Sequence, residues 1–426
     1  MPETKNPISP DSLQDSELLS AKQACEVLGV KPATLYTYVS RGKLHPVGQS
    51  TGRESLYLRQ DVLGLKARSE SRLGHGAVAA SAMRWGQPVI NTSITEITSR
   101  GPKYRGYLAT ELATYPGAFE GVAELLWSGV LPSGRHTWPV EPMDIDVQGA
   151  LDGMHIERMP SLRMMRVLAI AATSMGGGTL AEELRSGSLT SYSRQLIFAF
   201  VGCCGILGIK KKFHEPVGEQ PIAAHIVDAL GMPADPLLVD AINAALIVGA
   251  DHELSPATFT ARIAASVGAG LHACVVAALA TQVGSTLGGG CDQADQLLRG
   301  FASQAQIRVR VDEADRHRER LPGFALSLYP EGDPRAVLLI ELAKKLGKQS
   351  RQSELAFRFI EDVQSRLGIH PNIEVGLAML CLAGGLPERT AGALWGIGRS
   401  AGWIAHVLEQ RLAGFVLRPR GNYAAR

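Results

Sequence analysis

The feature that most constrains the fold is a continuous series of helical patterns from residue 160 to residue 249. Apolar side chains recur there with helical spacing, and no alternation of apolar and polar residues is long enough for a strand. The chain has 426 residues, 45% of them hydrophobic, so it can bury a core large enough for two or three domains. We therefore expect a mainly α-helical globular protein.

Two apolar runs have to be assigned either to the core or to a membrane. The first, 196–209, is too short to cross a bilayer, which takes about 20 residues. The second, 263–283, is longer but contains Ser266, His272 and Thr281 among many Gly and Ala residues. We interpret both runs as buried helices and expect no membrane association.

Charge and cysteine content narrow the function classes. The net charge of +2 argues against a protein that coats a polyanion, although a local basic patch is compatible with it. The six cysteines lack CxxC spacing and nearby paired histidines, so they suggest neither a zinc site nor a disulfide framework. The N-terminal residues are polar and acidic rather than signal-like. We expect no metal and a reduced, cytoplasmic setting.

Composition divides the chain into segments. Residues 1–18 are polar and aperiodic, which predicts a disordered tail. Residues 19–70 are patterned, and 71–84 are rich in Ser, Gly and Ala, as in a linker. The remaining residues, 85–426, form the main body.

Residues 19–70 have the pattern of a winged helix-turn-helix. Residues 20–23 (Ser-Ala-Lys-Gln) have the form of a capping box, and Gly29 ends the helix that they begin. Pro32 suits the first turn of a second helix, which Gly42 ends. Residues 44–57 contain Gly and β-forming residues, as a wing would. Two short helices joined by about three residues form a helix-turn-helix.

The charge of this segment favours double-stranded DNA as its partner. Between Lys31 and Arg72 there are eight Lys or Arg residues and three Asp or Glu residues. The segment resembles the small winged modules of the MerR and excisionase kind in Ala24, Leu28-Gly-Val, Thr34-Leu-Tyr, Arg41-Gly, Tyr57 and Asp61-Val. The alternative is a helical hairpin that docks a protein. For DNA, we expect major-groove contacts from Thr34, Tyr36, Thr37 and Ser40, and phosphate contacts from Arg41, Lys43 and Arg53.

An ionisable cluster interrupts the longest apolar stretch of the main body. Asp251, His252 and Glu253 follow an apolar run that begins at Leu246, and apolar and small residues resume as far as Val283. Ionisable groups held against a core usually mark functional sites. The segment therefore predicts a site near these three residues.

The main body resembles the citrate synthase family. The resemblance rests on Ser93-Ile-Thr-Glu-Ile, Tyr104-Arg-Gly-Tyr, Phe119 to Trp127, Ala250-Asp-His-Glu, Thr258-Phe, Ala261-Arg, Gly332-Asp-Pro-Arg, Arg399-Ser-Ala-Gly-Trp and Arg418-Pro-Arg. It implies an all-helical two-domain fold, with a large domain and a small lid domain at about 288–380. It also implies that an acyl-CoA, such as acetyl-CoA, is a cosubstrate and that no cofactor stays bound.

The resemblance assigns four residues to a di- or tricarboxylate ligand: His252, Arg335, Arg399 and Arg418. Arg418 matches an arginine that reaches into the partner subunit, which implies a homodimer. The alternatives are structural, with His252 as a satisfied core residue, Arg335 as a solvated surface residue and Arg418 as part of a solvated tail.

The chain departs from the family at its proton-handling positions. Leu287 and Leu326 stand where the family has two catalytic histidines, and leucine has no hydrogen-bond donor. Glu374 stands at the position of the family's catalytic Asp, with one more methylene. It is either a working base or a buried structural acid paired with an arginine.

Two functions follow from this pattern. The first is a degenerate citrate synthase-like protein that binds oxaloacetate- or citrate-type carboxylates and couples binding to DNA as a metabolite-responsive regulator. The alternative is an active citrate or 2-methylcitrate synthase-like acyltransferase that condenses an acyl-CoA with a 2-oxo acid, with Glu374 as base. Ground-state binding requires the retained arginines, whereas rate acceleration requires the lost donors.

Overall fold

In the computed structural model the chain forms two compact units, one comprising Met1–Asn91 and Arg418–Arg426 and the other Thr92–Leu417. The predicted tail 1–18, apart from Leu18, and the predicted linker 71–84 lie outside the described residues. The structure describes residues 18–40, 44–49, 55–59, 61–62, 65, 90–114, 117–134, 136–141, 146–152, 163–176, 179–186, 189–284, 290–346 and 350–419.

The N-terminal unit contains two short helices, α1 (Ala21–Leu28) and α2 (Pro32–Ser40). The predicted capping box is confirmed, because Ser20 Oγ accepts from the N–H of Gln23 at 3.3 Å and the Ser20 N–H donates to Gln23 Oε1 at 2.8 Å. Gly29 ends α1 with φ +64°, a left-handed conformation that glycine adopts without steric cost. Both ends of the first helix therefore follow from local sequence.

A three-stranded antiparallel sheet completes this unit. Its order is β1 (Leu18–Ser20), β3 (Ser55–Leu58), β2 (Pro46–Gln49), and β2 and β3 form the wing predicted at 44–57. The unit has its own apolar core, as expected of a segment that folds as a module. The core consists of Leu19, Ala24, Cys25, Leu35, Leu44, Tyr57, Val62 and Leu65.

The second unit begins with a small antiparallel sheet that the helical patterns did not predict. Its strands are β4 (Thr95–Thr98), β5 (Gly101–Tyr104) and β6 (Tyr107–Leu108). The buried hydroxyl of Tyr104 lies 3.2 Å from the carbonyl oxygens of Val248 and Asp251, and it accepts the N–H of Asp251 at 3.2 Å. The sheet therefore fixes the backbone that precedes the ionisable cluster.

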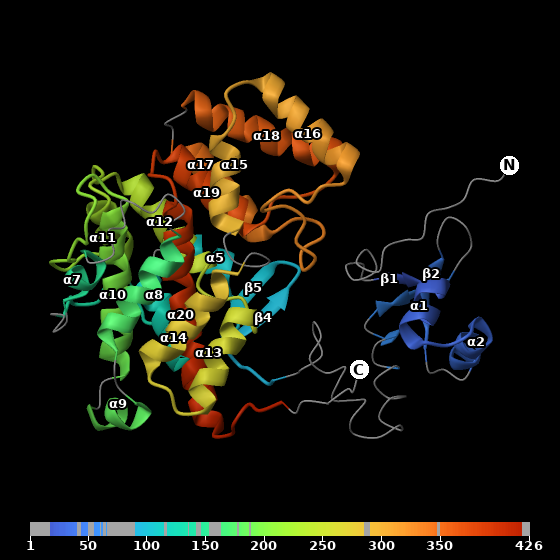
Figure 1. Ribbon diagram of the computed structural model, residues 1–426, viewed down its shortest axis with the longest axis horizontal. Coiled ribbons are helices and arrows are strands. Elements are labelled where there is room, and N and C mark those ends of the chain that lie inside the picture. Colours follow the sequence, from blue (N-terminus) through green and yellow to red (C-terminus); the bar gives the residue numbers. More distant parts are fainter. Residues whose placement is uncertain are drawn as a thin grey trace. The chain divides into compact units, whose positions relative to one another are not determined.

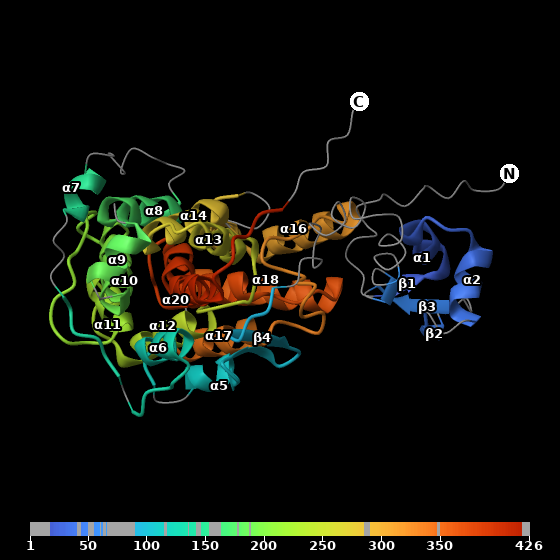
Figure 2. The ribbon, with the colours of Figure 1, turned by 90° about the horizontal axis from the view of Figure 1, so that it is seen from below.

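The rest of the second unit is helical, which confirms the mainly α fold. Helix α20 (Thr390–Ala413) runs through its middle and contacts helices on several sides (Figures 1 and 2). The helices before it are α5 (Ala109–Thr114), α6 (Phe119–Ser128), α7 (Val147–Asp152), α8 (Met164–Met175), α9 (Leu180–Ser186), α10 (Leu189–Cys203), the 3-10 turn η4 (Cys204–Ile206), α11 (Ile222–Ala229), α12 (Pro236–Val248), α13 (Pro256–Ser266) and α14 (Leu271–Gln282).

Five helices at the top of Figure 1 pack mainly on one another. They are α15 (Gly290–Arg299), α16 (Gln304–His317), α17 (Pro334–Lys345), α18 (Arg351–Leu367) and α19 (Ile373–Ala383). The small lid domain predicted at 288–380 covers most of this group, and its bounds stay a prediction.

Small residues of α20 let neighbouring backbone approach it closely. A Cβ on Gly402 would lie 2.5 Å from the carbonyl oxygen of Ala250, and the Gly402 N–H donates to that oxygen at 3.0 Å. The segment before α13 is thus bonded directly to the backbone of α20. This contact brings residues 250–253 beside Arg399.

The two apolar runs belong to helices of this body. Residues 196–203 belong to α10, whereas 263–283 spans two helices, α13 and α14, with a turn at Gly268 between them. Among the helices that the structure describes, none has both the length and the apolar character needed to cross a bilayer.

Candidate functional site

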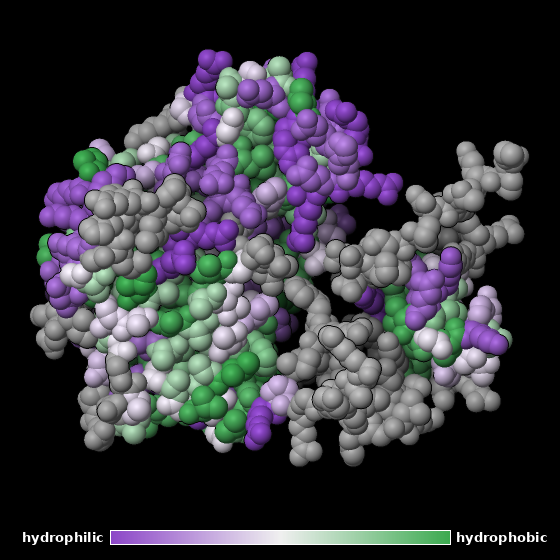
Figure 3. Space-filling view, in the orientation of Figure 1, coloured by the Kyte–Doolittle hydropathy of each residue, from purple (hydrophilic) through white to green (hydrophobic). Residues whose placement is uncertain are grey.

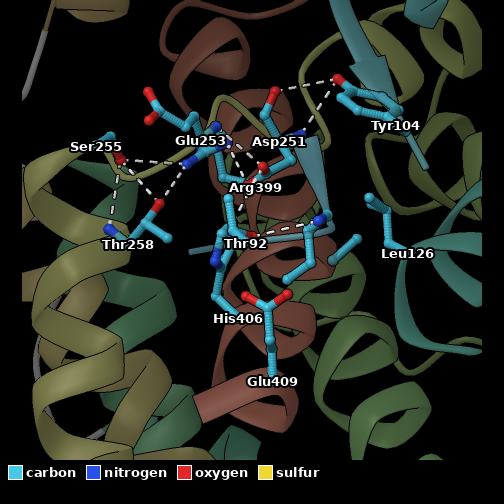
Figure 4. Close-up of polar contacts among 12 residues, drawn as sticks. Thr92, Tyr104, Leu126, Asp251, Glu253, Ser255, Thr258, Arg399, His406 and Glu409 are labelled. Atoms are coloured by element: carbon cyan, nitrogen blue, oxygen red, sulfur yellow. Dashed lines mark hydrogen bonds and ion pairs between the residues drawn. The ribbon is translucent and has the colours of Figure 1, made fainter. Parts of the chain in front are cut away.

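The segment between α12 and α13 is anchored by Asp251, whose side chain has no exposure to solvent. Oδ1 accepts from Arg399 Nη1 at 3.1 Å, and Oδ2 lies 3.3 Å from His406 Nε2 and accepts the N–H of Glu253 at 3.0 Å. Burial by itself raises the pKa of Asp251, but His406 and Arg399 outweigh it and hold that pKa well below its usual range. The carboxylate of Asp251 therefore stays ionised, and Arg399, His406 and the N–H of Glu253 hold it in place (Figure 4).

Arg399 reaches Asp251 from the middle of α20. Its Nη2 also donates to Thr258 Oγ1 at 2.8 Å and to Ser255 Oγ at 3.2 Å, so α20 and the start of α13 hold it together (Figure 4). The guanidinium lies 5.7 Å and 5.8 Å from the ring centres of Trp395 and Trp403. Burial lowers its pKa from the ordinary arginine value, although Asp251 opposes this. The positive charge of Arg399 is therefore held by several contacts and is buried away from solvent.

A chain of hydrogen bonds, buried as far as Arg262, continues from Asp251 along α20. Arg262 Nη1 lies 3.2 Å from His406 Nδ1, and because a guanidinium can only donate, Nδ1 must be the acceptor. Nε2 then carries the proton and donates to Asp251. Arg262 Nη1 also donates to Glu409 Oε2 at 2.6 Å, and Glu409 Oε1 accepts from the N–H of Ser93 at 2.8 Å. The chain thus links the site to the first residues of this unit.

Arg335 is buried at the start of α17, which rules out the alternative of a solvated surface residue. Its Nε and Nη2 donate to the two carboxylate oxygens of Asp333 at 2.9 and 2.8 Å. Asp333 also accepts the N–H of Ile373 at 3.0 Å, so one carboxylate joins the starts of α17 and α19. Burial lowers the pKa of Arg335, but Asp333 outweighs it and raises that pKa. The guanidinium lies 5.5 Å from the ring centre of Tyr329.

His252 lies next to Tyr329, with their ring centres 6.0 Å apart. Burial, then the positive charges of Arg335 and Arg399, hold the pKa of His252 well below its usual range. The imidazole is therefore neutral and has one donor and one acceptor nitrogen. Burial raises the pKa of Tyr329 to about 12, so its hydroxyl keeps its proton.

These side chains share one property that a satisfied core would not have. Each of the four has a buried polar atom without a hydrogen-bond partner among the described residues: His252 Nε2, Tyr329 Oη, Arg335 Nη1 and Arg399 Nε. Buried polar atoms in folded proteins are normally paired, so each exception requires an explanation. The contacts described above place the four residues side by side. Together they offer two buried guanidinium groups, a phenol and a neutral imidazole, a donor set suited to an anion.

Of the two leucines at the family's histidine positions, the structure describes only one. Leu287 lies outside the described residues. Leu326 is half-buried in the loop before α17, and the N–H of Tyr329 donates to its carbonyl oxygen at 2.9 Å. Its neighbour Ala325 has φ +57°, a left-handed conformation that favours the glycine of the family pattern, and its N–H donates to the carbonyl oxygen of His370 at 3.0 Å. The loop is kept, but residue 326 supplies no donor.

Glu374 lies in the first turn of α19, where its N–H donates to Asn372 Oδ1 at 2.8 Å and its Oε2 is 3.4 Å from Asn372 Nδ2. No ion pair joins Glu374 to an arginine among the described residues, which disfavours the paired structural acid. Burial raises the pKa of Glu374. Its carboxylate lies against the Cα of Gly290, at the wall of a small cavity. Arg163, Met164, Met165, Gln282, Gly290, Cys291, Asp292, Glu374, Gly392 and Trp395 line this cavity.

Replacing Asp292 with Asn should raise the free energy of unfolding at pH 7 by about 1–3 kcal/mol. Burial raises the pKa of Asp292 from 3.8 to about 6. Between about pH 4 and 6 the folded state therefore holds this proton more tightly than the unfolded state, and stability is lost as pH rises through about 6. Urea denaturation at pH 4 and pH 7 should show a gain only at pH 7. An equal gain at both pH values would rule out titration of Asp292 as its cause.

Tyr329 and Asp292 were not among the residues predicted from sequence. Tyr329 is the last residue of the motif that contains Leu326 and stands three residues before Gly332. The sequence signal that could have marked it as a site residue was an aromatic side chain in that loop. Asp292 follows the glycine-rich segment 288–290 and was visible only as an acid in a first helical turn. Burial, which sequence does not show, distinguishes both.

Helix α2 presents part of the predicted DNA-contacting set. Tyr36 is 61% exposed. Thr37 and Ser40 are exposed and Thr34 is half-buried. The hydroxyls of Thr37 and Ser40 donate to the helix carbonyl oxygens of Ala33 and Thr37 at 2.9 and 3.1 Å. The predicted phosphate ligands Arg41, Lys43 and Arg53 lie outside the described residues.

Arg418 is exposed, and no hydrogen bond or ion pair joins it to another residue that the structure describes. The N–H of the preceding Leu417 donates to Ser266 Oγ at 3.1 Å. The assignment of Arg418 to a neighbouring subunit's site stays a prediction. The described part of the chain contains no cluster of His, Cys, Asp or Glu that could hold a metal ion.

Comparison with protein families matches both units. The model described as citrate synthase, C-terminal domain, matches residues 82–420, and a model of a helix-turn-helix domain matches residues 18–68.

Similar curated proteins and solved structures point to the same family as the citrate synthase model. The chain is 27% identical to citrate synthase 2 of Bacillus subtilis over 78% of this chain and 92% of that protein. It is 26% identical to 2-methylcitrate synthase of Shewanella oneidensis, over 78% of this chain and 90% of that protein. Citrate synthase of Thermoplasma acidophilum, solved with carboxymethyl coenzyme A and oxaloacetate, has a TM-score of 0.68 at 21% identity and covers 80% of this chain and 95% of its own. The structure from Thermotoga maritima has a TM-score of 0.63 at 21% identity, with 80% and 94% covered.

Proposed function

This chain belongs to the citrate synthase family, and from that premise we propose that it binds an oxaloacetate- or citrate-type carboxylate and couples this binding to DNA. The observation that carries the proposal is the set of four unpaired buried atoms on His252, Tyr329, Arg335 and Arg399. A dicarboxylate supplies acceptors for the two guanidinium groups and the phenol, and the neutral imidazole can donate to or accept from it. An apolar ligand would leave all four atoms unpaired.

The altered positions favour a binding function over rapid catalysis. Arginine clamps bind the ground state, whereas donors aimed at developing charge accelerate a reaction. Each lost donor is worth on the order of 100-fold or more in rate. Leu326 supplies no such donor, and Leu287 has none by its chemistry. A metabolite sensor needs only the groups that remain.

The N-terminal unit supports DNA as the second partner. It matches a helix-turn-helix model, and its α2 exposes Tyr36, Thr37 and Ser40. The local excess of basic residues supplies the charge that phosphate contacts need.

The chain of hydrogen bonds from Arg399 to Ser93 supports coupling between the two functions. It begins at Arg399, where the ligand is proposed to bind, and ends at Ser93, the second residue of its unit. In the sequence, the predicted linker 71–84 lies between Ser93 and the helix-turn-helix. A ligand that changes the hydrogen bonds of Arg399 therefore acts on the segment that leads to the DNA-binding unit.

Replacing Glu409 with Gln should uncouple the two sites while leaving each intact. Allosteric coupling is typically worth about 5- to 150-fold in affinity, and we expect citrate to change DNA affinity within this range in the wild type. The variant loses the charged link between Arg262 and Ser93, so the ratio of DNA affinities with and without citrate should approach one. Gel shifts with the chain's own upstream DNA, at one fixed salt concentration, measure the ratio.

Calorimetry provides the test of carboxylate binding itself. Titration of the full chain with citrate and with oxaloacetate should release or absorb heat, and no heat with either at millimolar concentration would remove the proposal. If the wild-type chain binds citrate but not DNA, it is a carboxylate-binding protein, and the alternative role of its helix-turn-helix, docking of a protein, is then favoured. A coupling ratio that Glu409→Gln leaves unchanged would exclude this route but not the function.

A second function is favoured by Glu374. Its carboxylate lines a cavity beside the carboxylate site and has a raised pKa, as a general base requires. Condensation of an acyl-CoA with a 2-oxo acid would use this residue. A thiol-release assay with acetyl-CoA and propionyl-CoA decides between the two, because turnover near one per second or faster is typical of an enzyme.

A homodimer fits the surface of α14. No charged residue occurs between Leu271 and Gln282, and the less buried positions Ala273, Val276, Ala277 and Ala280 follow one helical stripe. Figure 3 shows a pale to green area over α13 and α14, in contrast to the hydrophilic surface at the top of this unit. An uncharged stripe of small residues suits close packing against a second copy.

A further inference from the structure

The cavity beside the carboxylate site contains two carboxyl groups, and each lies against a glycine. The Glu374 carboxylate occupies the space that a Cβ on Gly290 would take. A Cβ on Gly392 would lie 2.7 Å from Asp292 Oδ1. Any larger residue at either glycine would displace the carboxyl group that faces it. The helix starts of α15 and α19 thus bring two acids to the wall of one small cavity, with α20 behind them.

The carboxyl group of Asp292 lacks a hydrogen-bond partner in this position. Its Oδ1 is buried and has no hydrogen-bond partner among the described residues. The next acid along α15, Asp295, differs in this respect, because it accepts from Arg299 Nε at 2.7 Å and from the N–H of Arg389 at 3.0 Å. An acid in the first turn of a helix is normally stabilised as the anion, yet burial raises the pKa of Asp292 to about 6.

The charged surroundings of the two acids are similar, but their hydrogen bonds differ. Arg163 and Arg389 favour the anion of Asp292, whereas Asp295 opposes it. Arg320 and Arg335 favour the anion of Glu374, and Asp333 opposes it. Glu374 Oε2 also lies 3.4 Å from the side-chain amide of Asn372, which favours the anion of Glu374, whereas Asp292 Oδ1 has no partner among the described residues. Of two acids in one cavity, the one whose anion accepts a hydrogen bond ionises more readily.

We propose that Asp292 is a catalytic proton donor: its O–H hydrogen-bonds the carbonyl oxygen of a small acyl group while Glu374 removes a proton from the adjacent carbon. Both side chains line one cavity of about 10 Å³, which has room for a single water molecule, so an acyl group has to widen the cavity and then meets both acids. Asp292 would thereby supply the donor that Leu287 cannot.

The step is a reversible enolisation and needs no other reactant. Glu374 carboxylate takes a proton from the α-carbon, the C–H electron pair forms the carbon–carbon double bond, and the carbonyl pair moves onto oxygen. The Asp292 O–H holds that oxygen. In D₂O, Glu374 exchanges its proton with solvent and returns a deuteron, so one C–H and D₂O become C–D and HDO. This inference goes beyond carboxylate binding and does not depend on it, because the exchange consumes no oxo acid.

Deuterium incorporation into the methyl group of acetyl-CoA tests the proposal. The full chain is incubated in D₂O near pH 6, with and without citrate, and the acetyl group is analysed by mass spectrometry. Wild-type chain should exchange these protons faster than buffer does. Asp292→Ala should lower the exchange about 100-fold, the usual loss for one preorganised donor. Asp292→Asn, whose amide can donate, should stay within about tenfold of the wild type.

Two further variants separate catalysis from folding. Gly392→Ala favours the helix but pushes on Asp292, so it should melt no earlier than wild type and still lose exchange. Glu354→Gln, which replaces an exposed acid in the first turn of α18 rather than of α15, should exchange as the wild type does. Exchange that survives in Asp292→Ala would overturn the assignment, and so would wild-type chain that never exceeds buffer. Neither result would change the outcome of the calorimetric titration with citrate, so the two proposals fail separately.

Discussion

Replacing Arg335 with Met should weaken citrate binding about 100-fold and lower the free energy of unfolding by about 3–5 kcal/mol. The loss of affinity comes from removing a charged donor whose Nη1 has no partner among the described residues. The loss of stability has another cause, because Asp333 is 1% exposed and would be left as a buried charge without its bidentate partner. Calorimetric titration and urea denaturation measure the two effects separately.

Two variants make this result interpretable. Asp333→Asn combined with Arg335→Met removes both charges and keeps an acceptor for the N–H of Ile373, so it should recover most of the stability without recovering binding. Arg310→Met is the matched surface control, since Arg310 holds Glu319 with the same bidentate geometry at 2.9 and 2.7 Å. It should cost less than about 1 kcal/mol and leave binding unchanged. An Arg335→Met chain that still binds citrate within threefold of the wild type would show that Arg335 is structural only.

Replacing both Leu287 and Leu326 with His should raise thiol release from acetyl-CoA and oxaloacetate by at least about 100-fold. Each imidazole restores a donor at a position where the family has one. The two gains will not simply multiply, because groups that act on one reaction step are not additive. Initial rates of thiol appearance, with both substrates saturating, are the measurement.

Glu374→Gln in the two-histidine background should remove the gain, because the carboxylate that accepts the proton is then absent. Each single variant, Leu287→His and Leu326→His, should fall between the wild type and the double variant. A wild-type chain that already turns over near one per second or faster would contradict the regulator, whatever the histidines add. An unchanged rate in the double variant would show that the cleft has lost more than these two donors.

Local sequence was sufficient for the helices of the N-terminal unit. The capping box at Ser20, the left-handed Gly29 and the position of Pro32 act within a few residues of the chain, so a short stretch of sequence is enough to predict each of them. The small sheet of β4, β5 and β6 was not predicted, because its strands have two to four residues and show no alternation long enough to recognise. Its role, to hold the backbone at Asp251 through Tyr104, depends on contacts about 150 residues apart along the chain.

Sequence also determined the helical class and the family, because periodicity and motifs are properties of the chain itself, and it predicted which positions are altered. Only the tertiary structure decided that Arg335 is buried against Asp333, that Arg399 shares Asp251 with His406, and that Asp292 lies unpaired in the cavity with Glu374. The physical reason is the same in each case. A charge is tuned by burial and by the groups packed against it, and those groups come from helices that are distant in the sequence.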